Sequence, residues 1–211
     1  MPAALDAAIM GVHNLTADAE VFTANAYLVT GAVNALVDVG VVEGVDEEIA
    51  THVDTLDLVA LTHQHGDHVG ELDAVLDRFE ADLYAYEAHP RRTHQLTDGD
   101  TVQLGDDTYE AVYTPGHAAD HLAFLGETAI YTGDVVVYAD GAFEGGSFGR
   151  TDMAGQSRER LIESLRSILE RLGDDVTHMY PGHGPSYEGD VRAVIERALE
   201  RAERREPKYD D

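Results

Sequence analysis

The chain of 211 residues contains no cysteine and a single lysine, Lys208. Without cysteine, disulfides, thiolate nucleophiles and cysteine–metal sites are excluded, so any metal ligand must be His, Asp or Glu. No apolar stretch approaches the ~20 residues of a membrane-spanning helix. The amino terminus also lacks a basic segment followed by an apolar core, as a secretory signal requires. We therefore expect a soluble cytoplasmic protein with no membrane partner.

Positive charge is scarce, because 14 basic residues stand against 41 acidic ones and give a formal net charge of −27. Such a surface repels itself at low salt and is screened by counterions at high salt. With lysine almost absent, this balance predicts a halophilic source with a saline cytoplasm. It also argues against a nucleic-acid partner, which calls for a basic stripe. An acidic disordered chain is disfavoured because 44% of the residues are hydrophobic.

The length suits one domain over residues 1–211 and is too short for two ordinary domains. The hydrophobic pattern predicts helices over residues 44–53, 71–79, 87–95, 157–172 and 189–206. Short strands are predicted at residues 7–12, 25–30, 34–39, 57–61, 82–85, 101–104, 109–113, 121–125, 128–132 and 176–180. The glycine-rich stretch 134–156 has no clear period and is predicted to be a long functional loop.

A dense group of ligand-type side chains directly follows the apolar run 58–61. It consists of His63, His65, Asp67 and His68. Imidazole and carboxylate are usual ligands of Zn²⁺ and its first-row neighbours, and His63 and His65 can point the same way across one residue. Capping a helix would need only one such residue. The segment therefore predicts a metal site.

Three further turns carry a ligand-type residue just after a predicted strand. They are Thr-Pro-Gly-His, Thr-Gly-Asp and Tyr-Pro-Gly-His, and they end in His117, Asp134 and His183. Glycine and proline fix tight turns, so each ligand is held on a stiff loop. His121, four residues after His117, is expected to support the ligands.

The His-x-His-x-Asp-His pattern at residues 63–68, followed by His117, Asp134 and His183, resembles the metallo-β-lactamase superfamily over most of the chain. The resemblance implies an α/β fold, an αββα sandwich of two mixed β-sheets flanked by helices, with the site along one edge of the sheets. The turn at residues 38–40 is similar to the turn that lies below the site in this family.

The resemblance also implies a division of the ligands between two divalent ions, most simply Zn, with Fe or Mn possible. One ion would be bound by His63, His65 and His117, the second by Asp67, His68 and His183, and Asp134 would bridge both. The ligand count supports this, because seven donors exceed the needs of one tetrahedral ion, whereas two ions sharing a carboxylate use them all.

Within the superfamily, the segments 114–117, 149–152 and 181–184 are most similar to glyoxalase II-like hydrolases. This similarity implies hydrolysis of a thioester or ester, such as the hydroxyacyl ester of a small thiol. Water between two divalent ions loses a proton near neutral pH. Asp67 is then expected to be catalytic, orienting the hydroxide and carrying a proton toward the leaving group.

The identity of the thiol stays open at this point. Glyoxalase II enzymes carry a separate helical region with basic residues for glutathione, whereas here one charged helix is expected at residues 189–206. Arg150 can hold a substrate carboxylate or pair with Asp152. The candidate residues for the substrate pocket are Tyr138, Phe143, Phe148 and Arg150.

Other functions remain open on the sequence. Persulfide dioxygenases share the motif and use one iron, at positions matching His63, His117 and Asp134. Opening of a lactone or β-lactam is a third hypothesis, and cleavage of nucleic acid is disfavoured by the charge. A purely structural metal module is disfavoured because such sites seldom assemble two ions. The expected partner is a small-molecule substrate, with a homo-oligomer possible.

Overall fold

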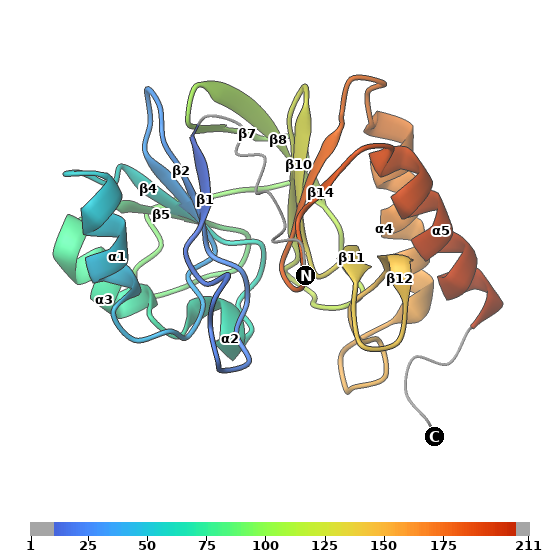
Figure 1. Ribbon diagram of the computed structural model, residues 1–211. Coiled ribbons are helices and arrows are strands. Elements are labelled where there is room, and N and C mark those ends of the chain that lie inside the picture. Colours follow the sequence, from blue (N-terminus) through green and yellow to red (C-terminus); the bar gives the residue numbers. More distant parts are fainter. Residues whose placement is uncertain (1–10, 206–211) are drawn as a thin grey trace, which may run out of the picture.

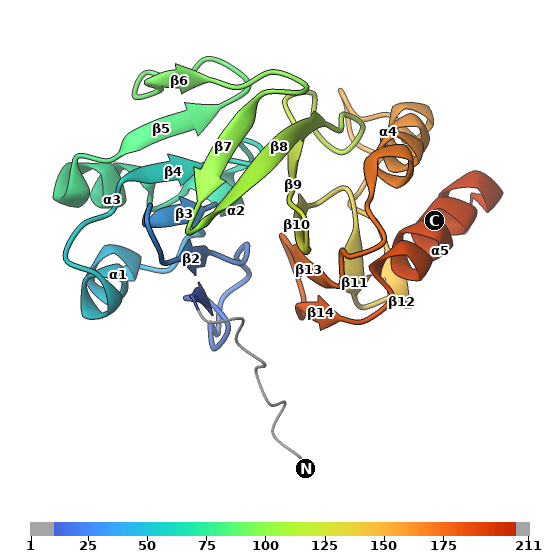
Figure 2. The same ribbon diagram turned by 90° about the horizontal axis from the view of Figure 1, so that it is seen from above.

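Two mixed β-sheets face each other in the computed structural model, which describes residues 11–205 (Figures 1 and 2). The first sheet has the strand order β1-β2-β3-β4-β5-β6, and the second has the order β14-β13-β10-β9-β8-β7. Helices α1 and α3 cover the outer face of the first sheet, and α4 and α5 cover the outer face of the second. The αββα sandwich implied by the sequence motifs is confirmed.

The bounds of the elements agree with the sequence patterns at most positions. The helices are α1 (Val45–His52), α2 (Gly66–Val69), α3 (Leu72–Phe79), α4 (Arg158–Arg171) and α5 (Val191–Arg204). The strands of the first sheet are β1 (Val12–Asn14), β2 (Tyr27–Val29), β3 (Ala35–Val37), β4 (Leu58–Ala60), β5 (Asp82–Ala85) and β6 (His94–Gln95). Those of the second sheet are β7 (Thr101–Leu104), β8 (Asp107–Tyr113), β9 (Leu122–Leu125), β10 (Ala129–Gly133), β13 (His178–Pro181) and β14 (Tyr187–Glu188). A separate hairpin consists of β11 (Val137–Ala139) and β12 (Glu144–Ser147).

The strand β4 explains why the chain forms two layers of sheet with three apolar cores. Leu58 and Ala60 face the core between the sheets, whereas Val59 and Leu61 face the core under α1 and α3. Side chains alternate along a strand, so an uninterrupted apolar run is buried on both faces. The four residues therefore fix β4 as a central strand, and the chain leaves its end toward His63.

The carboxyl ends of three strands meet at one edge of the sandwich. β3, β4 and β5 pair in parallel in the first sheet, and β10 pairs in parallel with β13 in the second. The edge is closed by backbone hydrogen bonds, from Gly182 N–H to the Gly133 carbonyl (2.8 Å) and from Leu122 N–H to the Thr62 carbonyl (2.7 Å). The turns after β4, β10 and β13 are thereby brought together.

Two predicted segments are wrong. Residues 87–95 are not a helix but a turn followed by β6, since Pro90 disfavours continuation of a helix and the stretch offers no apolar face to bury. The predicted loop 134–156 contains the β11–β12 hairpin, whose turn is closed by the Asp140 carboxylate accepting from Ala142 N–H and Phe143 N–H, each at 2.8 Å.

The predicted strand 7–12 falls largely outside the described residues, where β1 begins at Val12. Among residues 11–205, none of the helices combines the length and the apolar composition needed to cross a membrane.

Candidate metal centre

His63 is held at the end of β4 by a hydrogen-bond chain that fixes which ring nitrogen is free. Thr62 Oγ1 donates to Asp38 Oδ2 (2.7 Å) and lies 3.1 Å from His63 Nδ1. Since the hydroxyl proton is committed to Asp38, Thr62 Oγ1 accepts from Nδ1–H. The Nε2 lone pair of His63 therefore points into the centre of the site.

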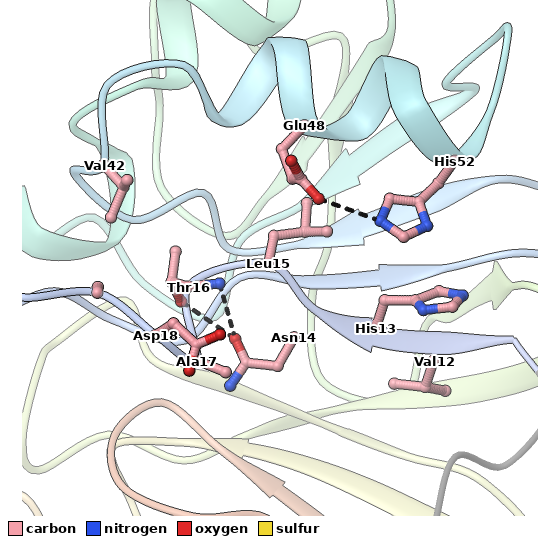
Figure 3. Close-up of a pocket in the computed structure, with 11 residues that line it drawn as sticks. Val12, His13, Asn14, Leu15, Thr16, Ala17, Asp18, Val42, Glu48 and His52 are labelled. Atoms are coloured by element: carbon pink, nitrogen blue, oxygen red, sulfur yellow. Dashed lines mark hydrogen bonds and ion pairs between the residues drawn. The ribbon is translucent and has the colours of Figure 1, made fainter. Parts of the chain in front are cut away.

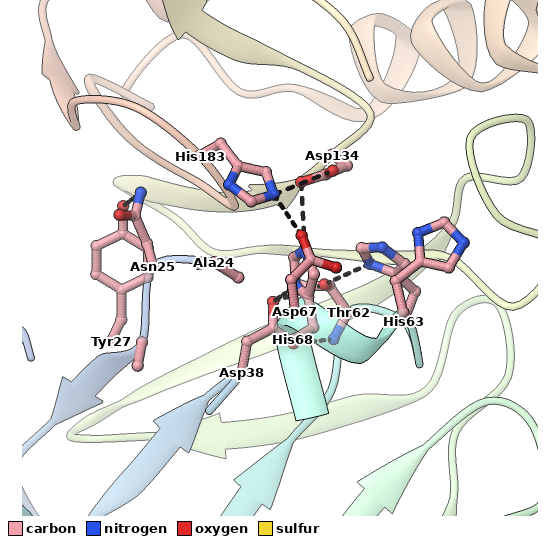
Figure 4. A network of polar contacts seen from close by, with 12 residues as sticks. Ala24, Asn25, Tyr27, Asp38, Thr62, His63, Asp67, His68, Asp134 and His183 are labelled. Carbon is pink, nitrogen blue, oxygen red and sulfur yellow. Dashed lines mark hydrogen bonds and ion pairs between the residues drawn. The ribbon is translucent and has the colours of Figure 1, made fainter. Parts of the chain in front are cut away.

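Asp38 also orients His68, which lies on the short helix α2 (Figure 4). His68 Nδ1 donates to Asp38 Oδ2 at 2.8 Å, and its Nε2 lies 3.5 Å from Asp134 Oδ1. A carboxylate behind an imidazole is the usual way in which a protein fixes the tautomer of a metal-binding histidine. Asp38 takes a left-handed conformation (φ 55°), so the turn at residues 38–40 presents its carboxylate to both Thr62 and His68.

His117 and His65 approach each other from different loops. His117 Nδ1 donates to the Arg150 carbonyl at 3.0 Å, which leaves Nε2 as its free nitrogen. That Nε2 lies 2.9 Å from His65 Nδ1 and 3.4 Å from Asp134 Oδ2. Two imidazole nitrogens at such a distance repel each other unless a proton or a metal ion lies between them.

Asp67 and His183 form the more open side of the centre. His183 Nε2 lies 3.1 Å from Asp67 Oδ2, and the two side chains are 21% and 26% exposed. His183 Nδ1 donates to the Thr23 carbonyl at 3.1 Å, and Ala24 N–H donates to the Asp67 carbonyl at the same distance. The loop before β2 thus supports both residues.

Asp134 lies between the two groups of ligands. Its Oδ2 is 3.5 Å from His183 Nε2, and its backbone N–H donates to His121 Nε2 at 2.9 Å. The packing is tight enough that a Cβ atom on Gly182 would lie 2.3 Å from Asp134 Oδ1. Glycine after β13 is therefore a requirement of the site, because only a bare backbone fits against the carboxylate.

Three buried polar atoms in this centre have no hydrogen-bond partner among residues 11–205: His63 Nε2, His68 Nε2 and Asp134 Oδ1. Buried polar atoms are rarely left unpaired, so these three unpaired atoms lower the stability of the protein when no metal ion is bound. The candidate metal-binding groups are His63 with His65 and His117; His63 with His68 and Asp134; and Asp67 with His68 and His183. In each group the ligand atoms lie within 4.8 Å of one another, so the donor set fits divalent metal ions.

The protonation states of His63 and Asp134 suit metal binding. Burial and the neighbouring His68 hold the pKa of His63 well below its usual value, so the ring is neutral. Burial opposes the charge on Asp134, but His68, His183 and His63 outweigh it and hold the pKa of that carboxyl well below its usual range. Neutral imidazole and ionised carboxylate are the forms that bind a metal ion.

Of the candidate pocket residues, Arg150 is tied to the centre by its backbone. Its carbonyl accepts from His117, while its guanidinium pairs with Asp152 (2.8 Å). Phe143 lies under Arg201, whose guanidinium carbon is 4.5 Å from the ring centroid, and Tyr138 stacks on Tyr187 at 4.4 Å. Phe148 is 1% exposed in the core under α4 and α5, so its ring supports the fold.

A cavity of about 400 Å³ lies elsewhere, between β1 and α1 (Figure 3). Its lining includes His13 and His52, whose ring centroids are 4.6 Å apart, and Glu48, which pairs with His52 at 3.4 Å. None of the seven metal-ligand candidates lines it. The cavity is therefore separate from the metal centre.

Several supporting residues escaped the sequence analysis. Thr62 and Asp120 are buried and brace the segment 63–68, Asp120 by accepting from Gln64 N–H at 3.0 Å. Thr23 supports His183 through its backbone carbonyl, and no side-chain pattern in the sequence reveals such a contact. Thr62 directly precedes His63, and Asp120 directly precedes His121. This adjacency was the signal in the sequence that could have identified both residues as supports of the centre.

The fold and the centre together define a class of protein. Two mixed sheets flanked by helices, with His and Asp ligand candidates in the turns after β4, β8, β10 and β13, form the metallo-β-lactamase fold. The model of the metallo-beta-lactamase superfamily matches residues 19–96, which contain four of the seven ligand candidates. The chain therefore has the metallo-β-lactamase fold, and its residues 19–96 are similar to the superfamily in sequence.

Comparison with individual proteins gives three informative similarities. The atrochrysone carboxyl ACP thioesterase of Aspergillus fumigatus is 33% identical over 194 residues, which cover 86% of this chain and 57% of that protein. A hydroxyacylglutathione hydrolase of Vibrio cholerae is 30% identical over 154 residues, covering 71% of this chain and 56% of that protein. The crystal structure of ETHE1 from Myxococcus xanthus superposes with a TM-score of 0.70 at 28% identity, covering 85% of this chain and 80% of that one. The chain thus spans little more than half the length of these two curated relatives.

Proposed function

We propose that this protein is a metal-dependent hydrolase that cleaves a thioester or ester at a centre of two divalent ions, most simply Zn²⁺. The observation that carries the proposal is the position of Asp134. Its two carboxylate oxygens face His117 (3.4 Å) of one ligand group and His68 and His183 (each 3.5 Å) of another. A carboxylate placed in this way would be able to serve two ions.

Divalent ions at these ligands would supply Lewis acidity and a water molecule that is deprotonated near neutral pH. The chain's own residues provide the geometry. Asp38, Thr62 and the carbonyls of Thr23 and Arg150 hold the imidazole rings in one tautomer and orientation. Preorganised ligands need no rearrangement at the moment of reaction.

Asp67 is the residue proposed to handle the proton. Its side chain lies on the open side of the centre, and the contact with His183 at 3.1 Å helps to hold its pKa below the usual value. It is therefore a carboxylate at neutral pH, able to orient the attacking water and to accept a proton destined for the leaving group. Arg150, whose carbonyl holds His117 and whose guanidinium pairs with Asp152, is proposed to exchange that partner for a substrate carboxylate.

The similar proteins favour the thioester, because one of them is a thioesterase and another a hydroxyacylglutathione hydrolase. The acidic surface disfavours nucleic acid as a substrate. A persulfide dioxygenase reaction remains the second candidate, since His63, His117 and Asp134 meet in the same centre.

The proposal is tested by counting bound metals in the purified protein and assaying thioesters, lactones, β-lactams and persulfides at high salt. We expect two ions per chain and turnover of thioesters. The matched variants are Asp67→Ala, which should lose at least a hundredfold in kcat while remaining folded, and Asp73→Ala, an exposed carboxylate on α3 that should leave kcat unchanged. One iron per chain with oxygen uptake on a persulfide would replace the hydrolase by the dioxygenase.

A further inference from the structure

Large exposed apolar side chains are confined to two loops in the described part of the chain. They are Val21 (57% exposed), Phe22 (78%) and Met153 (56%). Val21 and Phe22 lie in the loop between β1 and β2, and Met153 lies in the loop before α4. Both loops project from the edge of the molecule where α2 lies (Figure 1).

Each of these loops touches the metal centre. The Phe22 ring stacks on the His183 ring with centroids 4.9 Å apart and an interplanar angle of 17°. The next residue, Thr23, accepts from His183 Nδ1. On the other side, the Arg150 carbonyl accepts from His117, three residues before Met153. The Phe22 side chain therefore borders the open side of the site, and the loop that carries Met153 adjoins His117.

The two loops are also held in place. Thr23 Oγ1 accepts from Val41 N–H at 3.0 Å, and Met153 N–H donates to Gln156 Oε1 at 3.0 Å. Ser157 N–H donates to the Gly116 carbonyl at 2.8 Å, which ties the second loop to the turn that carries His117. Loops fixed in this way hold their apolar side chains ready for a ligand.

The small area of these apolar side chains and the net charge of the protein indicate which kind of ligand binds to them. Three side chains offer far less than the ~800 Å² per partner of a stable protein interface. The chain carries a net charge of −27, so an anionic group is repelled whereas a hydrocarbon chain is not. An apolar segment of a substrate already bound at the metal centre meets both conditions.

We infer that Val21, Phe22 and Met153 form an apolar surface that binds the hydrocarbon chain of a medium- or long-chain acyl thioester. This inference rests on the proposed hydrolase function and specifies its substrate class. It makes Phe22 and Met153 specificity-determining residues, with the thioester carbonyl at the metal centre and the acyl chain directed outward between the two loops.

The test is a series of straight-chain acyl thioesters of one small neutral thiol, from acetyl to decanoyl, assayed with the metal-loaded protein. In the wild type we expect kcat/KM to rise by up to about fourfold for each added methylene until the surface is covered. Phe22→Ala and Met153→Ala should each flatten this dependence, and Phe22→Leu should restore most of it. Glu20→Ala, an exposed polar change in the same loop, serves as the matched control and should keep the wild-type slope.

A second measurement does not depend on turnover. The affinity of unreactive acyl amides of the same lengths, measured by calorimetry, should rise with chain length in the wild type and in Glu20→Ala but not in Phe22→Ala or Met153→Ala. As a control, the number of metal ions bound per chain is measured in Phe22→Ala, and it should equal that of the wild type if His183 keeps its metal ion. Equal slopes in the wild type and both alanine variants would overturn the inference. Absence of thioester turnover combined with a length-dependent amide affinity would instead refute the proposed hydrolase and leave the apolar surface in place.

Discussion

At the residue scale, the centre depends on groups that never touch a metal. Each imidazole whose second nitrogen is accounted for has a different partner: Thr62 for His63, Asp38 for His68, the Arg150 carbonyl for His117 and the Thr23 carbonyl for His183. The free nitrogens converge because these partners are fixed. Metal affinity should accordingly be sensitive to changes one bond away from the ligands.

Asp38 is the strongest test of this dependence. Asp38→Asn keeps the size of the side chain but places a donor where Oδ2 now accepts from both Thr62 Oγ1 and His68 Nδ1. We expect a 10- to 100-fold loss of metal affinity, measured by competition with a chelator. Asp82→Asn, an exposed change on β5, is the control. Unchanged affinity in Asp38→Asn would show that His68 needs no carboxylate behind it.

His121 gives a prediction about pH. It is fully buried, with Nδ1 2.7 Å from Thr114 Oγ1 and Nε2 accepting from Asp134 N–H, so protonating Nε2 would set two N–H groups against each other. Burial, with a contribution from His117, lowers the pKa of His121 from 6.5 to about 3. Between pH 6.5 and about pH 3, His121 is therefore protonated in the unfolded state but neutral in the folded state. The stability contributed by neutral His121 is complete above pH 6.5 and is lost as the pH falls toward 3.

The measurement is urea unfolding of the metal-free wild type and His121→Asn from pH 8 to pH 5. The stability difference between the two proteins should stay constant down to about pH 6.5 and shrink steadily below it. The other histidines of the centre are common to both proteins, so the comparison isolates His121. A constant difference across the range would contradict the assigned tautomer.

At the element scale, α4 positions the turn that carries His117. Ser164, buried in the middle of α4, donates from Oγ to the Pro115 carbonyl at 2.7 Å. Ser157 caps the helix by accepting from Arg160 N–H at 3.3 Å. A Cβ atom on Gly116 would lie 2.4 Å from Leu161 N, so the turn and the helix lie in direct contact.

Ser164→Ala should therefore weaken both the fold and the centre. Removing the buried donor is expected to lower the free energy of unfolding by about 1–3 kcal/mol, measured with urea, because the Pro115 carbonyl loses its partner. Metal affinity should fall as well, since Pro115 lies two residues before His117. Ser186→Ala, an exposed change, should stay within about 0.5 kcal/mol of the wild type. A loss of stability without any loss of metal affinity would show that α4 does not position His117 for metal binding.

The elements also show which parts of the molecule the sequence can predict. The apolar run 58–61 and the spaced leucines of α4 report burial directly, so β4 and α4 were predicted to within a residue or two. The β11–β12 hairpin was missed because its strands are short and its turn depends on the Asp140 side chain.

Within the centre, the ligand types and their turns are visible in the sequence, but their supports are not. The carbonyls of Thr23 and Arg150 hold two imidazoles, and every residue has a carbonyl. The stacking of Phe22 on His183 joins residues 161 positions apart in the chain, and only the fold brings them together. Contacts that depend on the type of a side chain can be predicted from the sequence. Contacts made by backbone carbonyls, or by residues that only the fold brings together, require the structure.

At the scale of the whole molecule, the surface charge opposes folding at low salt. The 14 basic residues include six arginines that form short ion pairs with carboxylates, and 27 negative charges remain uncompensated. The pairing arginines are Arg78, Arg91, Arg150, Arg166, Arg171 and Arg205. Exposed pairs contribute about 0–1 kcal/mol each, so they do not offset repulsion summed over the whole surface.

Added salt should therefore stabilise the protein. Raising KCl from 0.1 M to 1 M shortens the screening length from about 10 Å to about 3 Å, which removes repulsion between carboxylates at the typical spacing of surface charges. The same screening weakens the arginine ion pairs, but the free energy that these pairs contribute is smaller than the repulsion between the carboxylates. We expect the melting temperature of the metal-loaded protein to rise by several degrees over this range, measured by calorimetry. Potassium glutamate and KCl at equal ionic strength serve as controls for specific ion effects. A melting temperature that falls with salt would mean that the arginine pairs, rather than the uncompensated carboxylates, dominate the surface electrostatics.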